Sequence, residues 1–425
     1  MELQVDKEMM SFKKLVKFPA LRIPEKQISL AIKKFKNLTF DIPQIKSIQP
    51  CDKLGYKLFL FDPSYLKENV KIEFPKIVNE FKEENKNIEI EETTVELELN
   101  HKNFTITELL KQILPEELHD SAPTSFEAAG HIAHLNLRKV FEEYKKQIAQ
   151  IIMLKNEKIK TVVNKKGAID NVFRTFEMEL LAGEEKYDVR LWENRCWFEF
   201  DFRRVYWNSR LQMEHSRLIE LINEQDVVCD MFAGVGPFAV PCARRRNATV
   251  YANDLNPSSF HYLQHNKKIN KIEDNKLHCY NLDAREFLQK MAKEGVIFTV
   301  AIMNLPKTAI EFLDVFRGIF RGMDDNFKQM PTIYCYCFSN AQDPEKDALQ
   351  RASKYLSFPI DENYPVTVER VRDVAPKKYM LCLQFVLPKE VAFENYDPLI
   401  SKRKNDLQDQ NYSNEKKKRI EEEIN

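Results

Sequence analysis

Residues 226–256 constrain the fold more than any other stretch of this 425-residue chain. An apolar run at 227–229 ends in Asp230, and a tight turn follows that contains Gly234 and Gly236. The chain has only nine glycines, so two of them within three positions indicate a backbone that bends sharply or lets a ligand approach closely. This pattern predicts a strand that leads directly into a ligand-binding turn.

The segments after the turn complete a predicted βαβ unit. A helical pattern covers 238–246, and a second strand-like run at 249–252 ends shortly before Asp254. Asp254 lies 20 residues after Gly234, the spacing at which such a carboxylate reaches the hydroxyls of a ribose. The same stretch also fits an ordinary loop with a surface aspartate. By itself it does not choose between a nicotinamide cofactor and S-adenosylmethionine.

The composition bounds the class of protein. The length allows two or three domains with a sizeable core. Lysine plus arginine and aspartate plus glutamate number 65 each, so any contact with nucleic acid must come from local basic clusters. The eight cysteines include no CxxC pair and predict buried, reduced thiols in an intracellular protein. The longest apolar runs fall short of the roughly 18 residues of a membrane span, so no membrane contact is expected.

Changes in pattern predict four segments. Residues 1–115 combine lysine-rich helical patterns with strands of period two and predict a small α+β domain. The break near Pro115 separates it from an α+β segment at 116–205, and 206–395 predicts an α/β domain. Residues 396–425 form a charged tail whose two basic runs have the spacing of a nuclear-import signal, although such runs are also common as solvated charge.

Aromatic and basic residues alternate around the boundary at residue 205. Trp192, Trp197, Tyr206 and Trp207 are interspersed with lysines and arginines. Aromatic rings stack on bases and cations hold phosphates, so the pattern predicts a surface that faces RNA. Packing in the core of a sheet is an equal alternative.

Polar residues follow the later predicted strands of the α/β domain. The strands at 277–281 and 297–303 are followed by Asp283 and Asn304. Ligands of open parallel sheets bind at the carboxyl ends of the strands, so these residues belong to one predicted site with Asp254. Each acid is also of the type that caps a helix.

Several ordered motifs resemble those of the archaeal and eukaryotic tRNA (guanine-37-N1) methyltransferases. The resemblance covers about residues 115–390, and its most specific segments are SFEAAGHIAHLNLR, VYWNSRL followed by Glu214, DMFAGVGPFA and VRDVAPKKYM. It implies a Rossmann-like class I methyltransferase domain, preceded by an α+β RNA-binding segment and a small N-terminal α+β domain that recognises the shape of tRNA.

The resemblance also implies the reaction. The enzyme is expected to transfer a methyl group from S-adenosylmethionine to N1 of the guanosine on the 3′ side of the anticodon. Its expected partner is tRNA, and it is expected to act as a monomer. The cytoplasm and nucleus are the expected compartments, with the mitochondrial matrix as an alternative.

Catalytic residues follow from the chemistry and from the resemblance together. Guanine N1 carries a proton near neutral pH, so a base must remove it, and the charge that spreads onto O6 needs a donor. Glu214 matches the family's proposed general base by its place after Tyr206 and Arg210, which are expected to bind the substrate. Arg174 aligns with the arginine that stabilises O6, although a plain surface arginine fits the same position.

The loop Asn304-Leu305-Pro306 matches a family loop that touches both cofactor and target base. Asn304 is therefore expected to serve in catalysis and in cofactor binding, and Pro306 in substrate binding. Leu305 and Lys307 stand where methyltransferases of exocyclic amines have a proline and an aromatic residue. This departure favours a ring nitrogen as the target.

Further residues are expected to bind the cofactor. Asp254 is expected to hold the ribose hydroxyls, Asp283 and Ala284 to meet the adenine edge, and His215 to lie near the methionine portion. The complete expected set is His215, Phe232, Gly234, Gly236, Asp254, Leu255, Asp283, Ala284 and Asn304. Two histidines three residues apart, His131 and His134, lack a third ligand at suitable spacing, so no metal is expected.

Other functions fit part of these observations. A relative that moves the aminocarboxypropyl arm of the same cofactor, in wybutosine-type modification, shares the glycine turn, but Glu214 and the Asn304 loop favour methyl transfer. A non-catalytic RNA-binding module has no need of Glu214 and the polar strand ends. If the chain were a nicotinamide oxidoreductase, the basic aromatic segment and the Asn304 loop would have no role.

Overall fold

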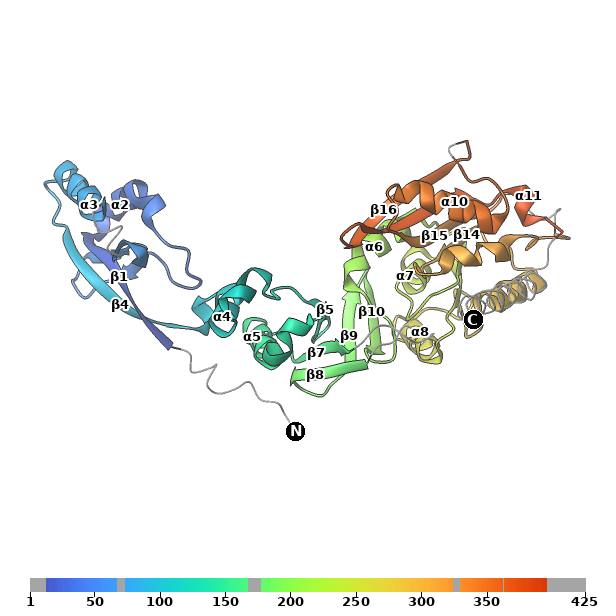
Figure 1. Ribbon diagram of the computed structural model, residues 1–425, viewed down its shortest axis with the longest axis horizontal. Helices are drawn as coiled ribbons and strands as arrows, with labels where there is room; N and C mark the ends of the chain where they lie inside the picture. The colour runs from blue at the N-terminus through green and yellow to red at the C-terminus, as the bar shows by residue number, and fades with distance from the viewer. Residues whose placement is uncertain (1–12, 67–72, 167–176, 324–328, 362, 396–425) are drawn as a thin grey trace, which may run out of the picture. The chain divides into compact units, whose positions relative to one another are not determined.

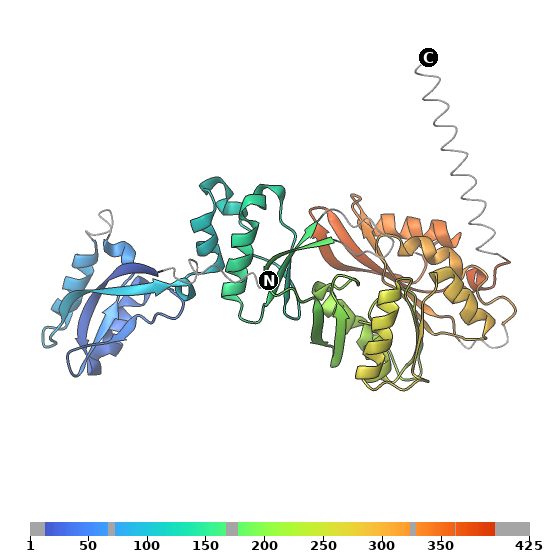
Figure 2. The same cartoon turned by 90° about the horizontal axis from the view of Figure 1, so that it is seen from below.

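The computed structural model divides the chain into two compact units, whose elements are drawn in Figure 1 and Figure 2. Unit 1 extends to Lys165 and includes 178–186, and unit 2 includes everything from Tyr187 onward. The residues that the structure describes are 13–66, 73–166, 177–323, 329–361 and 363–395. Arg174 and the charged tail with its basic runs lie outside the described residues.

The first part of unit 1 is an antiparallel sheet in the order β2-β3-β1-β4 with two helices. Its elements are β1 (Lys13–Pro24), α2 (Ile28–Phe35), β2 (Ile48–Pro50), β3 (Tyr56–Leu60), α3 (Glu73–Glu84) and β4 (Glu91–Asn100). Phe35 of α2 packs its ring 5.8, 5.1 and 4.7 Å from those of Phe59, Phe61 and Phe81. These buried rings hold both helices on one face of the sheet.

The second part of unit 1 is the sheet β5-β6-β7-β8 with its own core. Its elements are α4 (Ile106–Ile113), β5 (Glu127–Ala129), β6 (Ile132–Leu135), α5 (Lys145–Lys155), β7 (Thr161–Lys166) and β8 (Glu177–Gly183). The core joins Leu110 of α4 to Ile148 and Ile152 of α5. Helix α4 therefore packs with this part, whereas the boundary predicted at residue 115 grouped it with the preceding domain.

A separate hairpin of two strands, β9 (Asp188–Glu193) and β10 (Cys196–Asp201), belongs to unit 2. The boundary predicted at residue 205 had grouped this hairpin with the preceding segment. Two side chains of α8 (Pro257–Ile269) explain the difference. Asn266 Oδ1 accepts the Glu199 backbone N–H at 2.9 Å, and the Asn270 side chain, just after α8, bonds the Trp197 N–H and carbonyl at 2.9 and 2.7 Å.

The remainder of unit 2 alternates strands and helices. Its further elements are α6 (Gln212–Leu221), β11 (Val227–Asp230), α7 (Ala239–Arg246), β12 (Thr249–Asn253), β13 (Leu277–Tyr280), α9 (Ala284–Lys293), β14 (Val300–Met303), β15 (Thr332–Ser339), α10 (Pro344–Leu356), β16 (Val366–Ala375), β17 (Lys378–Val386) and α11 (Lys389–Ala392). The segment after Asn304 contains a 3₁₀ helix, Ala309–Phe316.

These strands form one sheet in the order β13-β12-β11-β14-β15-β17-β16. Strands β11 to β15 pair in parallel, and β17 runs antiparallel to both of its neighbours. Helices α9 and α10 share a core cluster with β14 and β15, whereas α7 contacts α6 and α8. The strand order reverses between β11 and β14, and ligands of such sheets bind at the carboxyl ends beside this reversal.

Six of the eight cysteines are buried, and all eight are free thiols. Within the described ranges, no helix has both the length and the apolar character needed to cross a membrane.

Candidate active site

Four neighbouring parallel strands end in polar or glycine-containing loops at the same edge of the sheet. The turn 232–237 follows β11, Asp254 follows β12, Asp283 follows β13, and Asn304 follows β14. Because these strands are adjacent in the sheet, the fold gathers the residues that the sequence predicted as one site.

The two glycines of the turn have different roles. Gly234 has a φ of +55°, and a Cβ built on it would meet no heavy atom within 4 Å. Gly236 has a φ of +97°, and its Cβ would lie 2.7 Å from Val240 Cγ2 and 2.8 Å from Leu263 Cδ1. Gly236 therefore allows the close packing of the turn against α7 and α8, while Gly234 leaves open space in which a ligand fits.

Asp254 is bound to the glycine turn. Its Oδ2 accepts the Gly234 backbone N–H and its Oδ1 accepts the Asn256 backbone N–H, both at 2.9 Å. Burial raises the pKa of Asp254, and these backbone donors oppose that rise. Asp283, by contrast, is the N-cap of α9, since its Oδ1 accepts the Arg285 backbone N–H at 2.9 Å. The capping alternative thus applies to Asp283, and its second oxygen is the one that remains to meet a ligand.

Asn253, which was not among the predicted site residues, connects the loops of the site by hydrogen bonds. This side chain is 1% exposed. Its Nδ2 donates to the carbonyls of Met231 and Leu282 at 3.3 and 3.0 Å, and its Oδ1 accepts the Leu282 N–H at 3.0 Å. One amide therefore fixes the chain after β11, β12 and β13. Its position directly before Asp254 was the available signal.

Buried oxygen atoms of two side chains beside these loops have no hydrogen bond of normal geometry within the described residues. Neither oxygen of the fully buried Asp230 carboxylate has a hydrogen bond of normal geometry, and Asn304 Oδ1 has none either. Buried polar atoms normally have partners, so these atoms fit an edge that receives a polar ligand. S-adenosylmethionine offers hydroxyl, ammonium and adenine donors, which suits this set of acceptors.

Asp230 makes the stability of the protein depend on pH. Burial raises the pKa of Asp230 to about 8; the Phe232 backbone N–H opposes the rise, and the Asp254 charge adds a lesser contribution to it. Between pH of about 4 and about 8 the native state then binds more protons than the unfolded state, so the free energy of unfolding falls as pH rises. We expect that the free energy of unfolding of Asp230→Asn does not show this decrease with pH. Urea unfolding of both proteins without cofactor at pH 5 and pH 8 checks the expectation, and parallel losses of stability in the two proteins would contradict it.

Glu214 lies in the first turn of α6 and is 8% exposed. Arg217 donates from Nε to Oε2 at 2.8 Å and from Nη2 to Oε1 at 2.7 Å. The Tyr336 hydroxyl of β15 donates to Oε1 at 2.6 Å. Burial raises the pKa of Tyr336 well above its usual value, so this hydroxyl remains a proton donor. Oε2 has a single hydrogen bond and keeps room for a further donor.

Aromatic contacts bring Glu214 and the glycine turn into one neighbourhood. The ring of Phe238, the residue directly after the turn, lies 6.1 Å from that of Tyr336 and 4.8 Å from that of His215. His215 is 3% exposed, and its Nδ1 lies 2.7 Å from Glu193 Oε1. This is the environment of a packed core histidine, and a role for His215 in cofactor binding stays a prediction.

The other expected residues differ in exposure. Tyr206 is 41% exposed and Arg210 is also exposed, as residues that meet a large substrate must be. Leu255 is 45% exposed beside Asp254.

Phe232 is half-buried, with its ring 5.2 Å from that of Phe312. Pro306 is buried, and its carbonyl accepts the Phe338 N–H at 2.9 Å.

The tryptophans divide between surface and core. Trp192 and Trp197 are 54% and 38% exposed, whereas Trp207 is only 8% exposed. The Trp207 ring packs 5.1 Å from that of Phe200. Of the two alternatives, core packing therefore holds for Trp207, because this residue fills the space between the hairpin and α6.

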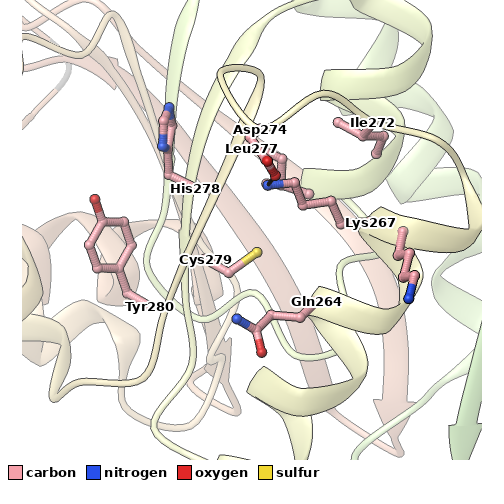
Figure 3. A pocket seen from close by; sticks show the side chains of 9 residues that line it. Gln264, Lys267, Ile272, Asp274, Leu277, His278, Cys279 and Tyr280 are labelled. Carbon is pink, nitrogen blue, oxygen red and sulfur yellow. Dashed lines mark ion pairs between the residues drawn. The ribbon is translucent and has the colours of Figure 1, made fainter.

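A cavity of about 600 Å³ lies between α8 and the edge strand β13 (Figure 3). It is lined by Gln264, Lys267, Lys268, Ile272, Asp274, Leu277, His278, Cys279 and Tyr280. None of the residues expected to bind cofactor or substrate is among them. The cavity is therefore distinct from the site at the strand ends.

The histidine pair at 131 and 134 belongs to β6 and the turn before it. His131 Nε2 lies 3.2 Å from the Lys186 carbonyl. In the part of the chain that the structure describes, no group of three or more His, Cys, Asp or Glu side chains is placed to hold a metal ion.

The fold and the site together define a class. A mostly parallel sheet in the order 3-2-1-4-5-7-6, with a glycine turn after its first strand and acids after the next two, is a Rossmann-like S-adenosylmethionine-dependent methyltransferase. Residues 190–324 match the family model of the TRM5/TYW2 methyltransferase domain, and 106–186 match that of the TYW2 N-terminal domain.

Curated relatives narrow the class. A protein of Batrachochytrium dendrobatidis is 39% identical, over 91% of this chain and 89% of its own length. One of Phytophthora infestans is 41% identical, over 90% and 92%, and one of Mus musculus is 38% identical, over 91% and 77%. All three are named tRNA (guanine(37)-N(1))-methyltransferase. The chain therefore belongs to the tRNA (guanine(37)-N(1))-methyltransferase family.

Solved structures agree with this assignment. Trm5b from Pyrococcus abyssi is 25% identical with a TM-score of 0.62, and the match covers 87% of this chain and 98% of that one. The complex of aTrm5 with tRNALeu gives 25% identity and a TM-score of 0.60, with 87% and 99% covered. The chain is a tRNA methyltransferase that uses S-adenosylmethionine.

Proposed function

We propose that this enzyme methylates N1 of the guanosine at position 37 of tRNA and that Glu214 is the base that removes the N1 proton. The observation that carries the proposal is the buried Glu214 carboxylate, held by Arg217 and by Tyr336, whose ring lies 6.1 Å from that of Phe238 directly after the glycine turn. The curated relatives bear the name of this activity.

Methylation of guanine N1 requires a base that removes its proton, and a carboxylate can be that base. S-adenosylmethionine supplies a methyl group on a sulfonium, which needs neither a metal nor a covalent nucleophile to activate it. Glu214 Oε2 has the free acceptor capacity to take the proton from guanine N1. The cofactor, when bound, would supply the methyl group to N1, and its C–S bond would break to leave the thioether S-adenosylhomocysteine. Arg217 and Tyr336 fix the direction of the carboxylate, so little reorientation is needed at the moment of transfer.

The residues at the strand ends are proposed to hold the cofactor. Asp254 suits the ribose hydroxyls, because its carboxylate is partly buried and already oriented by the Gly234 and Asn256 N–H groups. The unpartnered Asn304 Oδ1 suits an amino donor of the cofactor or of the guanine. The open space at Gly234 leaves room for the ligand. Arg174 remains a candidate donor to guanine O6 on the resemblance alone.

Tyr336 is proposed to act through Glu214 as a positioning residue. We expect Tyr336→Phe to lower kcat roughly tenfold to a hundredfold, since a hydrogen bond to a charged group contributes about 1.5–3 kcal/mol. The affinity for S-adenosylmethionine is expected to stay within about twofold of the wild type, because the Tyr336 hydroxyl bonds Glu214 and not a residue of the strand-end loops. Single-turnover rates and cofactor titration check both expectations. A kcat equal to that of the wild type would remove Tyr336 from the mechanism.

A double-label experiment tests the reaction type. S-adenosylmethionine labelled in its methyl group and, separately, in its carboxyl group is incubated with the protein and an unmodified tRNA that has guanosine at position 37. Methyl label is expected in the tRNA, and carboxyl label is not. Carboxyl label in the tRNA would instead indicate aminocarboxypropyl transfer, and cofactor binding without any transfer would favour a non-catalytic RNA-binding protein.

A further inference from the structure

An arginine-rich groove lies at the tip of the β9–β10 hairpin, away from the residues assigned to catalysis. It has a volume of about 580 Å³ and is lined by Arg195, Glu220, Arg244, Arg245 and Arg246. Four guanidinium groups face one carboxylate there, in a chain whose formal net charge is zero. This is the kind of local basic cluster that binds anions in a protein without a global field.

Two of the arginines are fixed and two are available. Arg245 pairs with Glu220 at 2.7 Å, and Arg246 bonds Glu220 at 3.2 Å and the Ile222 carbonyl at 2.6 Å. Arg195 and Arg244 are exposed, and within the described residues neither forms an ion pair. Glu220 is thus used by its two partners, which leaves the other two charges for an external anion.

The hairpin holds Arg195 in place. Asn194 and Arg195 have φ values of +49° and +59°, which is the backbone of a tight two-residue hairpin turn. The Ser216 hydroxyl of α6 donates to Asn194 Oδ1 at 2.7 Å. A rigid turn lowers the entropic cost of binding for the arginine that it carries.

The outer face of the same hairpin is aromatic. Trp192 and Trp197 are cross-strand partners with ring centroids 4.9 Å apart, and both are exposed. The Arg190 guanidinium lies 4.4 Å from the Trp197 ring. The backbone of Trp197 is fixed by Asn270, so these rings stay in place without a ligand. Exposed rings next to arginines suit unpaired bases and their phosphates.

We propose that the arginine groove and the Trp192–Trp197 face form a docking surface for tRNA backbone and bases outside the nucleotide that is methylated. This inference rests on the proposed function, which supplies tRNA as the ligand. Helix α7 has eight residues and runs from the glycine turn to Arg246, so the groove lies on the order of 10 Å from that turn. The surface therefore contributes to binding of tRNA and not to the chemical step.

The test compares charge removal in the groove with equal charge removal elsewhere. The variant is Arg195→Ala with Arg244→Ala, and the control is Lys293→Ala with Lys354→Ala, two exposed lysines of α9 and α10. Binding of an unmodified tRNA transcript is measured without cofactor at several salt concentrations. We expect Kd to rise about tenfold or more in the variant and the salt slope to fall by roughly two, one for each lost phosphate contact, with the control unchanged. Arg195→Lys with Arg244→Lys is expected to restore most of the slope.

The Trp192–Trp197 face is tested by a separate variant. Trp192→Ala is expected to raise Kd roughly fivefold to tenfold with an unchanged salt slope, because stacking releases no counterions. If the arginine variant keeps the wild-type Kd for tRNA and the wild-type salt slope, the proposal is overturned. The groove would then be a candidate site for an acidic protein partner. These measurements are independent of turnover. If the wild type binds tRNA through the groove but makes no 1-methylguanosine, the docking surface stands and the proposed function fails.

Discussion

Replacement of Glu214 by glutamine is expected to lower kcat by roughly 10²- to 10⁴-fold, the range typical of a lost general base. Glutamine keeps the shape of the side chain and still accepts the Tyr336 hydrogen bond, but it cannot take a proton from guanine N1. Within the described residues the side chain of Glu214 bonds Arg217 and Tyr336 and no residue of the strand-end loops, so the Kd for S-adenosylmethionine is expected to stay near that of the wild type.

A control must show that the Glu214→Gln protein is still folded. Glu214 neutralises Arg217, which is one-third exposed, so its loss leaves a guanidinium that water still reaches. We therefore expect a loss of stability small enough to leave the protein folded at 25 °C, which thermal unfolding and cofactor titration verify. Equal losses of cofactor affinity and turnover would make Glu214 a structural residue and contradict its role as a base.

The two glycines of the turn are expected to respond oppositely to alanine. Gly236→Ala adds a Cβ that meets Val240 and Leu263 at less than 3 Å in the core, at a φ that L residues rarely adopt. Overpacking and backbone strain of this kind cost roughly 2–5 kcal/mol together, a large part of the stability of a typical domain. We expect this variant to be largely insoluble or to unfold at a much lower temperature.

Gly234→Ala should fold, because its Cβ points into open space and the backbone costs only about 1–2 kcal/mol. The new methyl group enters the space proposed for the cofactor, so the Kd for S-adenosylmethionine is expected to rise tenfold or more. Calorimetric titration and thermal unfolding of both variants separate the two effects. A Gly234→Ala protein that binds the cofactor as tightly as the wild type would place the cofactor elsewhere.

The α/β domain was predictable because each of its buried strands is a short apolar run that ends in a turn or a polar residue. Five predicted elements lie within a few residues of the observed ones: Val227–Asp230, Ala239–Arg246, Thr249–Asn253, Leu277–Tyr280 and Val300–Met303. The gathering of Asp254, Asp283 and Asn304 at one edge follows from parallel pairing alone. The capping of α9 by Asp283 was also among the stated alternatives.

Other features depend on contacts between distant segments and leave little trace in the sequence. The partners of Glu214 include Tyr336, 122 residues away, which reads as an ordinary strand residue. Strand β1 lies between β3 and β4 and buries four consecutive residues, 18–21, so it lacks the alternation by which strands are predicted. Trp207 looks like its exposed neighbours in sequence, and only the fold distinguishes it from them.

In the proposed mechanism, a carboxylate beside the glycine turn activates a ring nitrogen of guanosine for methyl transfer. Nucleoside mass spectrometry of a tRNA treated with the pure enzyme and S-adenosylmethionine tests it most directly, because fragmentation and chromatography distinguish N1 from the exocyclic amine. We expect 1-methylguanosine at position 37 with the wild type and almost none with Glu214→Gln. A methyl group on the exocyclic amine, or wild-type amounts of product with Glu214→Gln, would contradict it.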